Sequence, residues 1–128
     1  MVVLELTDVQ VSFGGLRALD GVSFSVEEGE VVGLIGPNGS GKSTTFNAVT
    51  GTLKPSGGRI VFAGEDITGL PAHRIARKGI ARTFQVVRPF AHLTALENVL
   101  AGRLFGGPEQ TVCIRAGARH PAGSAMIR

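Results

Sequence analysis

The stretch from residue 31 to residue 44 constrains the fold of this chain more than any other segment. It is a short apolar run followed by a glycine-rich loop, with the sequence Val-Val-Gly-Leu-Ile-Gly-Pro-Asn-Gly-Ser-Gly-Lys-Ser-Thr. Residues 36–43 match the pattern G-x-x-x-x-G-K-[ST], which joins a buried strand to the start of a helix. The sequence therefore predicts a strand, a phosphate-binding loop and a helix in that order.

The residue types in this loop suit a phosphorylated ligand. Glycines let the backbone turn tightly and aim several N–H groups at one point, which makes a concave site for anionic oxygens. The helix that begins near Lys42 adds the positive end of its dipole. Lys42 supplies an ammonium for the outer phosphates, and the Ser43 hydroxyl is placed to bind Mg²⁺. The alternative is a glycine-rich turn that binds nothing, which the match at every fixed position disfavours.

Composition and charge bound the class of protein. The chain has 128 residues, 43% of them hydrophobic and 19 of them glycine, so we expect at most one turn-rich domain with a hydrophobic core. Residues 1–107 carry ten Lys and Arg against nine Asp and Glu, and residues 108–128 carry three Arg against Glu109. Because the body is nearly neutral, the charge gives no support for nucleic acid as a partner.

Cysteine usage and hydropathy indicate the compartment. Cys113 is the single cysteine, so no disulfide forms within the chain, and a reducing, intracellular compartment fits. Residues 1–11 lack the basic start of a signal peptide, and no apolar run approaches the roughly 20 residues of a membrane helix. We therefore expect a soluble, cytoplasmic protein.

Apolar periodicity predicts antiparallel strands ahead of the loop. Residues 4–6, 9–13 and 22–26 alternate between apolar and polar types, as half-buried strands do. The links between them are too short for helical crossovers, which favours antiparallel pairing. Residues 31–35 are almost continuously apolar, which predicts a strand that is covered on both faces.

Start and stop signals predict short elements after the loop. We expect helices over residues 41–49, 71–78 and 94–101, and strands over residues 59–62 and 80–84. Gly51 and Gly79 end the first two helices, and Thr94 with Glu97 forms a capping box at the start of the third. Residues 108–128 are rich in Gly, Ala, Pro and Arg without an apolar rhythm, and we expect them to be disordered.

A phosphate-binding loop alone leaves kinases, small GTPases, recombinases and transport ATPases open, and the flanking residues narrow the choice. The run 36–44 and the preceding Leu-Asp-Gly-Val-Ser-Phe of residues 19–24, with the Glu-Gly-Glu turn of residues 28–30, resemble the nucleotide-binding domains of ABC transporters. The resemblance implies an α/β fold, that of the ABC-type nucleotide-binding domain among P-loop NTPases. This chain would hold its N-terminal portion: antiparallel β strands, the phosphate-loop strand and helix, and the start of the helical subdomain.

The resemblance also implies an ATP site with Mg²⁺. Its phosphates would be held by Gly36, Pro37, Asn38, Gly39, Ser40, Gly41, Lys42, Ser43 and Thr44. Phe13 matches the family aromatic that stacks on adenine, since a ring face is a flat apolar platform for a purine; the alternative is a core or rim phenylalanine. Gln85, in the run Arg-Thr-Phe-Gln, matches the Q-loop glutamine. There it would bind Mg²⁺ together with Ser43 and sense the attacking water, although a glutamine after a strand is usually a solvated loop residue.

Three longer runs indicate a subgroup. Residues 64–71, 80–90 and 93–99 resemble the ATP-binding subunits of branched-chain amino acid importers. The resemblance implies ATP hydrolysis coupled to import, membrane permease subunits and a second ATP-binding subunit as partners, and a peripheral place on the inner face of the membrane. The alternative is a non-transport ABC ATPase of DNA repair or translation, which the near-neutral body disfavours.

The resemblance covers residues 2–106, and the composition changes at the same place. We therefore expect a partial ABC ATP-binding domain over residues 1–107 and a tail unlike the family over residues 108–128. The 128 residues lack the family's signature sequence, the Asp-Glu pair that ends its next strand, and a switch histidine; surface positions fit His73, His92 and His120. We expect a truncated N-terminal half that binds nucleotide at most and is inactive alone, or a non-functional remnant.

Overall fold

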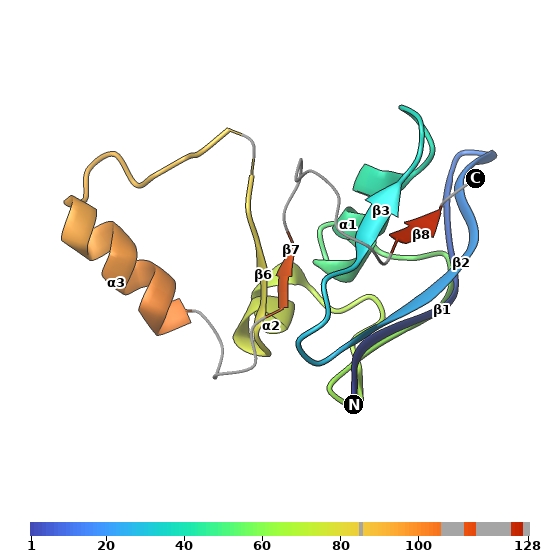
Figure 1. Ribbon diagram of the computed structural model, residues 1–128. Helices are drawn as coiled ribbons and strands as arrows, with labels where there is room; N and C mark the ends of the chain where they lie inside the picture. Colours follow the sequence, from blue (N-terminus) through green and yellow to red (C-terminus); the bar gives the residue numbers. More distant parts are fainter. Residues whose placement is uncertain (85, 106–111, 115–123, 127–128) are drawn as a thin grey trace.

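The computed structural model describes residues 1–84, 86–105, 112–114 and 124–126 (Figure 1). The helices are α1 (Lys42–Val49), α2 (Ala72–Arg77) and α3 (Ala95–Phe105). The strands are β1 (Val2–Phe13), β2 (Leu16–Glu27), β3 (Gly33–Ile35), β4 (Gly57–Phe62), β5 (Glu65–Asp66), β6 (Ile80–Arg82), β7 (Val112–Ile114) and β8 (Ser124–Met126).

An antiparallel sheet with the strand order β2-β1-β4-β5 forms the larger part of the structure. Strand β1 lies inside it, pairing with β2 on one side and with β4 on the other. The predicted antiparallel arrangement is confirmed. The two runs expected at residues 4–6 and 9–13 are parts of one strand, because β1 continues through an irregularity at Asp8, which has a φ of 49°.

The irregularity in β1 keeps its apolar residues on one face. Leu6 pairs with Phe24 and Val9 with Val22, so β1 contributes one residue more than β2 between these pairs. An unbroken strand would have put Leu6 and Val9 on opposite faces, yet both are buried. They belong to the hydrophobic core, which comprises Val3, Leu4, Leu6, Val9, Val11, Leu19, Ala48, Val49, Ile60, Phe62, Ile67, Ile75 and Ile80. Helices α1 and α2 thus share one core with the sheet.

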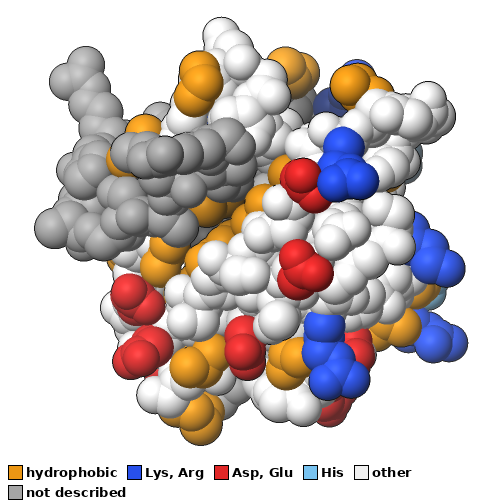
Figure 2. Space-filling model, turned by 90° about the vertical axis from the view of Figure 1, so that its right-hand side faces the viewer, with side chains coloured by type: hydrophobic (Ala, Val, Ile, Leu, Met, Phe, Trp, Pro, Cys, Tyr) orange, Lys and Arg blue, Asp and Glu red, His pale blue; other side chains and the backbone are white. Residues whose placement is uncertain are grey.

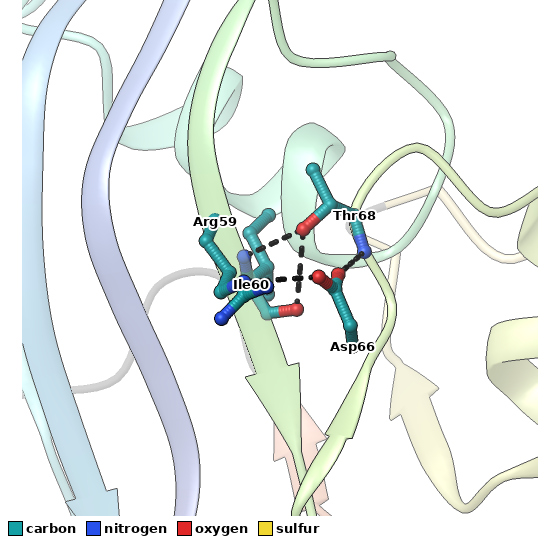
Figure 3. Close-up of polar contacts among 4 residues, drawn as sticks. All are labelled: Arg59, Ile60, Asp66 and Thr68. Atoms are coloured by element: carbon teal, nitrogen blue, oxygen red, sulfur yellow. Dashed lines mark hydrogen bonds and ion pairs between the residues drawn. The ribbon is translucent and has the colours of Figure 1, made fainter.

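Polar contacts close the β4–β5 edge of the sheet (Figure 3). The N–H of Ile60 donates to Oγ1 of Thr68 over 2.8 Å, and the N–H of Thr68 donates to Oδ1 of Asp66 over 2.9 Å. Arg59 Nε lies 3.0 Å from the other carboxylate oxygen of Asp66. Hydrogen bonding from Thr68, through its side chain and its N–H, lowers the pKa of Asp66, and the Arg59 charge lowers it further. These contacts hold the chain at the turn into α2.

The strand ahead of the loop is less covered than expected. Gly33 and Leu34 are half-buried, Ile35 is 39% exposed, and Val31, which precedes the strand, is 67% exposed. The prediction of cover on both faces is therefore wrong within the described residues. An apolar run indicates a strand, but its burial depends on layers from distant parts of the sequence. In the described part of the chain β3 pairs with β8 alone, in parallel.

The three helices begin where they were predicted to within one residue. Pro71 precedes α2 as its N-cap instead of serving as its first residue, and α3 continues to Phe105, past the expected end. The capping box is confirmed, since the N–H of Thr94 donates to Oε2 of Glu97 over 2.7 Å and the N–H of Glu97 donates to Oγ1 of Thr94 over 3.2 Å. None of the helices in the described residues is long and apolar enough to cross a membrane.

Helix α3 lies apart from the sheet and from the other two helices (Figure 1). Its apolar side chains are exposed, at 67% for Leu96, 70% for Val99 and 78% for Leu104. On the face shown in Figure 2, acidic and basic side chains are interspersed, and hydrophobic side chains lie both in a band across the middle and at the edges. Among the described residues, α3 and the segment before it carry eight of the fourteen exposed large hydrophobic side chains, and the other six lie between Met1 and Ile35.

Six residues of the predicted tail form strands. Residues 112–114 make β7, which pairs in parallel with β6, and residues 124–126 make β8 beside β3. The expectation of disorder over residues 108–128 thus differs from the structure at these six positions. Pairing with a strand more than 30 residues away leaves no trace in local composition, which is why the sequence did not predict it. The division at residue 107 stays a prediction.

Candidate nucleotide-binding site

The predicted strand, loop and helix are present in this order. Strand β3 ends at Ile35, residues 36–41 form the loop, and α1 begins at Lys42. The loop turns through Gly39 and Gly41, whose φ angles are 83° and 96°. Because β3 and α1 are joined by only six residues, the loop backbone is confined to the space between the strand end and the helix start.

Gly41 brings the loop against strand β2. A Cβ at this position would lie 2.5 Å from Cδ2 of Leu19 and 3.0 Å from the carbonyl oxygen of Ala18. Both the left-handed backbone and this close approach require glycine. Leu19 is buried in the core, so the loop rests on a rigid part of the sheet. The glycine at this position of the motif is therefore required by packing as well as by the binding of phosphate.

The ammonium of Lys42 lies within the loop. Its Nζ donates to the carbonyl oxygen of Gly36, to the carbonyl oxygen of Pro37 over 2.8 Å and to Oγ of Ser40 over 3.4 Å. The side chain is half-buried. A cation that is held by loop oxygens at the start of a helix can exchange some of these contacts for the oxygens of an anion. The charge needed to bind phosphate is thus already in place.

The first turn of α1 is open to a ligand. Its N-cap is Gly41, and no side chain caps the helix. The N–H groups of a first helical turn have no partners within the helix, and the helix dipole adds a partial positive charge there. Thr45 is buried and its Oγ1 donates to the carbonyl oxygen of Gly41 over 2.9 Å, which fixes this end of the helix. The arrangement suits an anion.

Ser43 fits Mg²⁺ only in combination with phosphate oxygens. Its side chain is exposed beside Lys42, and a hydroxyl is the kind of hard oxygen ligand that Mg²⁺ accepts. Among the described residues no group of three or more His, Cys, Asp or Glu side chains could hold a metal ion alone. A bound nucleotide would therefore have to supply further ligands.

The other two predicted site residues are placed differently. Phe13 ends β1 at the hairpin with β2, where it pairs with Leu16, and its side chain is 49% exposed. Further along β2, Ala18 and Leu19 lie close to Gly41, and they follow Phe13 by five and six residues. Exposure excludes a buried core position for Phe13, and its contact with adenine stays a prediction. Gln85 lies outside the described residues.

One contact of the phosphate-loop helix had no signal in the sequence. Nη1 of Arg82 donates to Oδ1 of Asn47 over 2.6 Å, which joins the end of β6 to the middle of α1. The residues are 35 positions apart, and neither belongs to the loop motif.

The surface positions expected for His73 and His92 are confirmed by their exposure, and His120 lies outside the described residues.

Comparison with known proteins identifies the family. The family model for ABC transporters matches residues 19–125, which extends past the end of the resemblance expected at residue 106. The high-affinity branched-chain amino acid transport ATP-binding protein BraF of Pseudomonas aeruginosa is 54% identical over 101 residues, 79% of this chain and 40% of BraF. The protein LivG of Escherichia coli K12, which has the same description, is 45% identical over 120 residues, 88% of this chain and 47% of LivG.

A solved structure supports the fold. It is described as the ADP conformation of an ATP-binding cassette from an ABC transporter, is 44% identical, and superimposes with a TM-score of 0.73 over 87% of this chain and 43% of its own. This confirms the predicted fold, the N-terminal portion of an ABC-type P-loop domain. The chain spans less than half the length of each of these proteins. Family match, sequence identity and fold agree, and the chain belongs to the ABC transporter family.

Proposed function

We propose that this protein is the ATP-binding subunit of an ABC transporter and that it couples ATP hydrolysis to the import of branched-chain amino acids. The observation that carries the proposal is the position of Lys42, whose ammonium lies inside the loop at the uncapped start of α1. The names of BraF and LivG support the transported solute. They also favour transport over the alternative of a DNA-repair or translation ATPase.

In this proposal the phosphates of ATP bind to the loop backbone from Gly36 to Thr44. Lys42 turns from the carbonyl oxygens of Gly36 and Pro37 to the outer phosphates, where its charge offsets theirs. Mg²⁺ would be held by Ser43 and Gln85 and would neutralise the phosphate charge. Phe13 would stack on the adenine ring.

The partners follow from the same assignment. An ATP-binding subunit of this family acts with membrane permease subunits and with a second ATP-binding subunit. We therefore place the protein on the inner face of the cell membrane, held by its permease partners. The apolar side chains of α3 are exposed, so this helix offers a surface for contact with another protein.

We expect the 128-residue chain by itself to bind ATP and to hydrolyse it negligibly. Hydrolysis needs a residue that orients the attacking water and a carboxylate behind the metal, and both act on the transition state. In the family these residues are the Asp-Glu pair, which the sequence lacks. The expected result is stoichiometric binding with no turnover above that of a Lys42→Ala variant.

Equilibrium dialysis with radiolabelled ATP and Mg²⁺ tests the phosphate site. Lys42→Ala is expected to weaken ATP binding by at least about tenfold, because a charge-assisted contact with phosphate is lost. Lys54→Ala is the matched control, since Lys54 is exposed and lies outside the loop, and it should leave the affinity unchanged. Equal affinities for the two variants would contradict the proposal.

Uptake of radiolabelled leucine, isoleucine and valine by cells tests the solute. Cells that carry the Lys42→Ala allele in the complete gene are expected to lose high-affinity uptake, whereas cells with the Lys54→Ala allele retain it. Uptake of an unrelated amino acid such as lysine should be equal in both strains. Unchanged leucine uptake in the Lys42→Ala strain would exclude branched-chain amino acids as the transported solute.

A further inference from the structure

We propose that Arg82 and Asn47 are positioning residues that join the phosphate-loop helix to the segment after β6, so that ligand binding at the loop changes the surroundings of Phe84. The inference rests on the proposed function, because the ligand at the loop is taken to be ATP. It concerns a contact outside the loop motif. The site and the partner surface described above do not require it.

Asn47 lies on the helix that follows the phosphate loop directly. It lies on α1 five residues after Lys42, and the helix has only eight residues. A helix this short is not stable in isolation, so its position depends on the contacts that it makes with the rest of the fold. Asn47 lies about one and a half helical turns from Lys42, so a shift of the loop end of α1 also shifts Asn47.

Arg82 connects this helix to a different part of the chain. Its Nη1 donates to Oδ1 of Asn47 over 2.6 Å, and both side chains are half-buried. In the described part of the chain this is the one side-chain hydrogen bond between α1 and another helix or strand. A guanidinium donor strengthens it relative to a bond between neutral groups, because the donor carries charge.

The same guanidinium holds the ring of Phe84. The Arg82 Cζ atom lies 5.1 Å from the centroid of the Phe84 ring, a distance at which a cation is attracted to the ring face. Phe84 is 65% exposed, so no packed core fixes its orientation. Asn47, Arg82 and Phe84 thus form a continuous chain of contacts from α1 to the surface.

The geometry sets a direction for the effect. Loss of the Asn47 oxygen leaves Arg82 without its partner on α1, and the guanidinium is then free to change rotamer together with the ring that it holds. Ala48 and Val49 still anchor α1 in the core, so the phosphate loop itself stays formed. Removal of either side chain should therefore abolish the change at Phe84 without preventing ATP binding at the loop.

A single tryptophan can report on this separation. The chain contains no Trp and no Tyr, so Phe84→Trp gives an emission signal from one position only. The full chain with F84W is titrated with ATP and Mg²⁺, and emission is followed alongside equilibrium dialysis of radiolabelled ATP. We expect ATP to change the emission of F84W.

Four further variants are made in the F84W background. N47A and R82A should abolish the emission change while ATP affinity falls by no more than about tenfold, because neither side chain belongs to the phosphate loop. N47D keeps an oxygen that accepts from Arg82, and it should restore the change. Arg77→Ala removes an exposed arginine of α2 as the matched control and should leave the response intact.

The outcomes separate this inference from the proposed function. If N47A and R82A retain the emission change, or if N47D loses it although it is folded by circular dichroism, the positioning role is wrong while ATP binding stands. If F84W and the unmodified chain both fail to bind ATP in dialysis, the proposed function and the inference are overturned together.

Discussion

Gly41 approaches Leu19 so closely that a Cβ on the glycine would lie 2.5 Å from the leucine Cδ2. The phosphate loop thereby packs against a buried residue of β2, and this contact positions the loop relative to the sheet. This contact sets the first of four predictions.

Gly41→Ala should destabilise the chain and weaken ATP binding. The substitution forces an alanine into a backbone with a φ of 96° and presses its methyl group against Leu19. Backbone strain of this kind costs about 1–3 kcal/mol, and the clash adds to it. The free energy of unfolding in urea measures the effect. Gly39→Ala is the control, since its φ is 83° but no atom lies within 4 Å of the added Cβ, and it should lose less stability than Gly41→Ala.

Ser43→Ala should make ATP binding less dependent on Mg²⁺. The Ser43 side chain is exposed, so its removal leaves the stability of the fold unchanged to within about 0.5 kcal/mol. ATP affinity is measured by dialysis with Mg²⁺ and with EDTA, and the ratio of the two affinities should fall for Ser43→Ala. Ser43→Thr keeps a hydroxyl and should keep the ratio. An equal ratio in all three proteins would remove Ser43 from the metal site.

Asp66→Asn should change the acid sensitivity of the fold. Hydrogen bonding from Thr68 and the charge of Arg59 hold the pKa of Asp66 below its ordinary value of 3.8. A carboxyl with a lowered pKa in the folded state stabilises the fold above its unfolded pKa, and this contribution disappears as pH falls through the folded value.

Urea unfolding at several pH values measures this effect. The stability difference between the unmodified chain and Asp66→Asn should be constant above about pH 5 and should shrink below about pH 4. Because the contacts of Asp66 are exposed, the effect on the midpoint of unfolding is expected to be small. A difference that grows as the pH falls would contradict the assignment.

Thr94→Ala should shorten α3 at its N-terminus. The Thr94 hydroxyl accepts from the N–H of Glu97, and the Thr94 N–H donates to the Glu97 carboxylate, which lowers the pKa of Glu97. Loss of an N-cap side chain costs about 1 kcal/mol of helix stability. Circular dichroism at 222 nm should show less helix for Thr94→Ala and no change for Thr94→Ser. Equal helicity in the alanine and serine variants would show that the cap is dispensable.

Local features of the fold were predictable from the sequence. The loop motif, the stop at Gly51 and the capping box at Thr94 each depend on residues within a few positions of one another. Their geometry is therefore encoded in a short window, and the structure confirms all three. Antiparallel pairing of β1 with β2 was predictable for the same reason, because only two residues separate the strands.

Features that depend on distant residues were not predictable. The cover on β3, the pairing of β7 and β8, and the contact of Arg82 with Asn47 all join segments more than 30 residues apart. A single sequence carries no periodicity for such contacts, since they depend on how the finished elements pack. The loop was predicted for its chemistry, whereas its contact with Leu19 emerged only from the structure.

The contacts of the Lys42 ammonium with three oxygens reduce the side-chain entropy that is lost when a ligand binds. A lysine side chain that moves freely in water loses about 2 kcal/mol of rotamer entropy when it is fixed by a ligand. Lys42 is already fixed by Gly36, Pro37 and Ser40, so this entropy is lost when the chain folds and not when the ligand binds. An arriving phosphate then exchanges one set of oxygen partners for another, and the lysine need not be ordered anew.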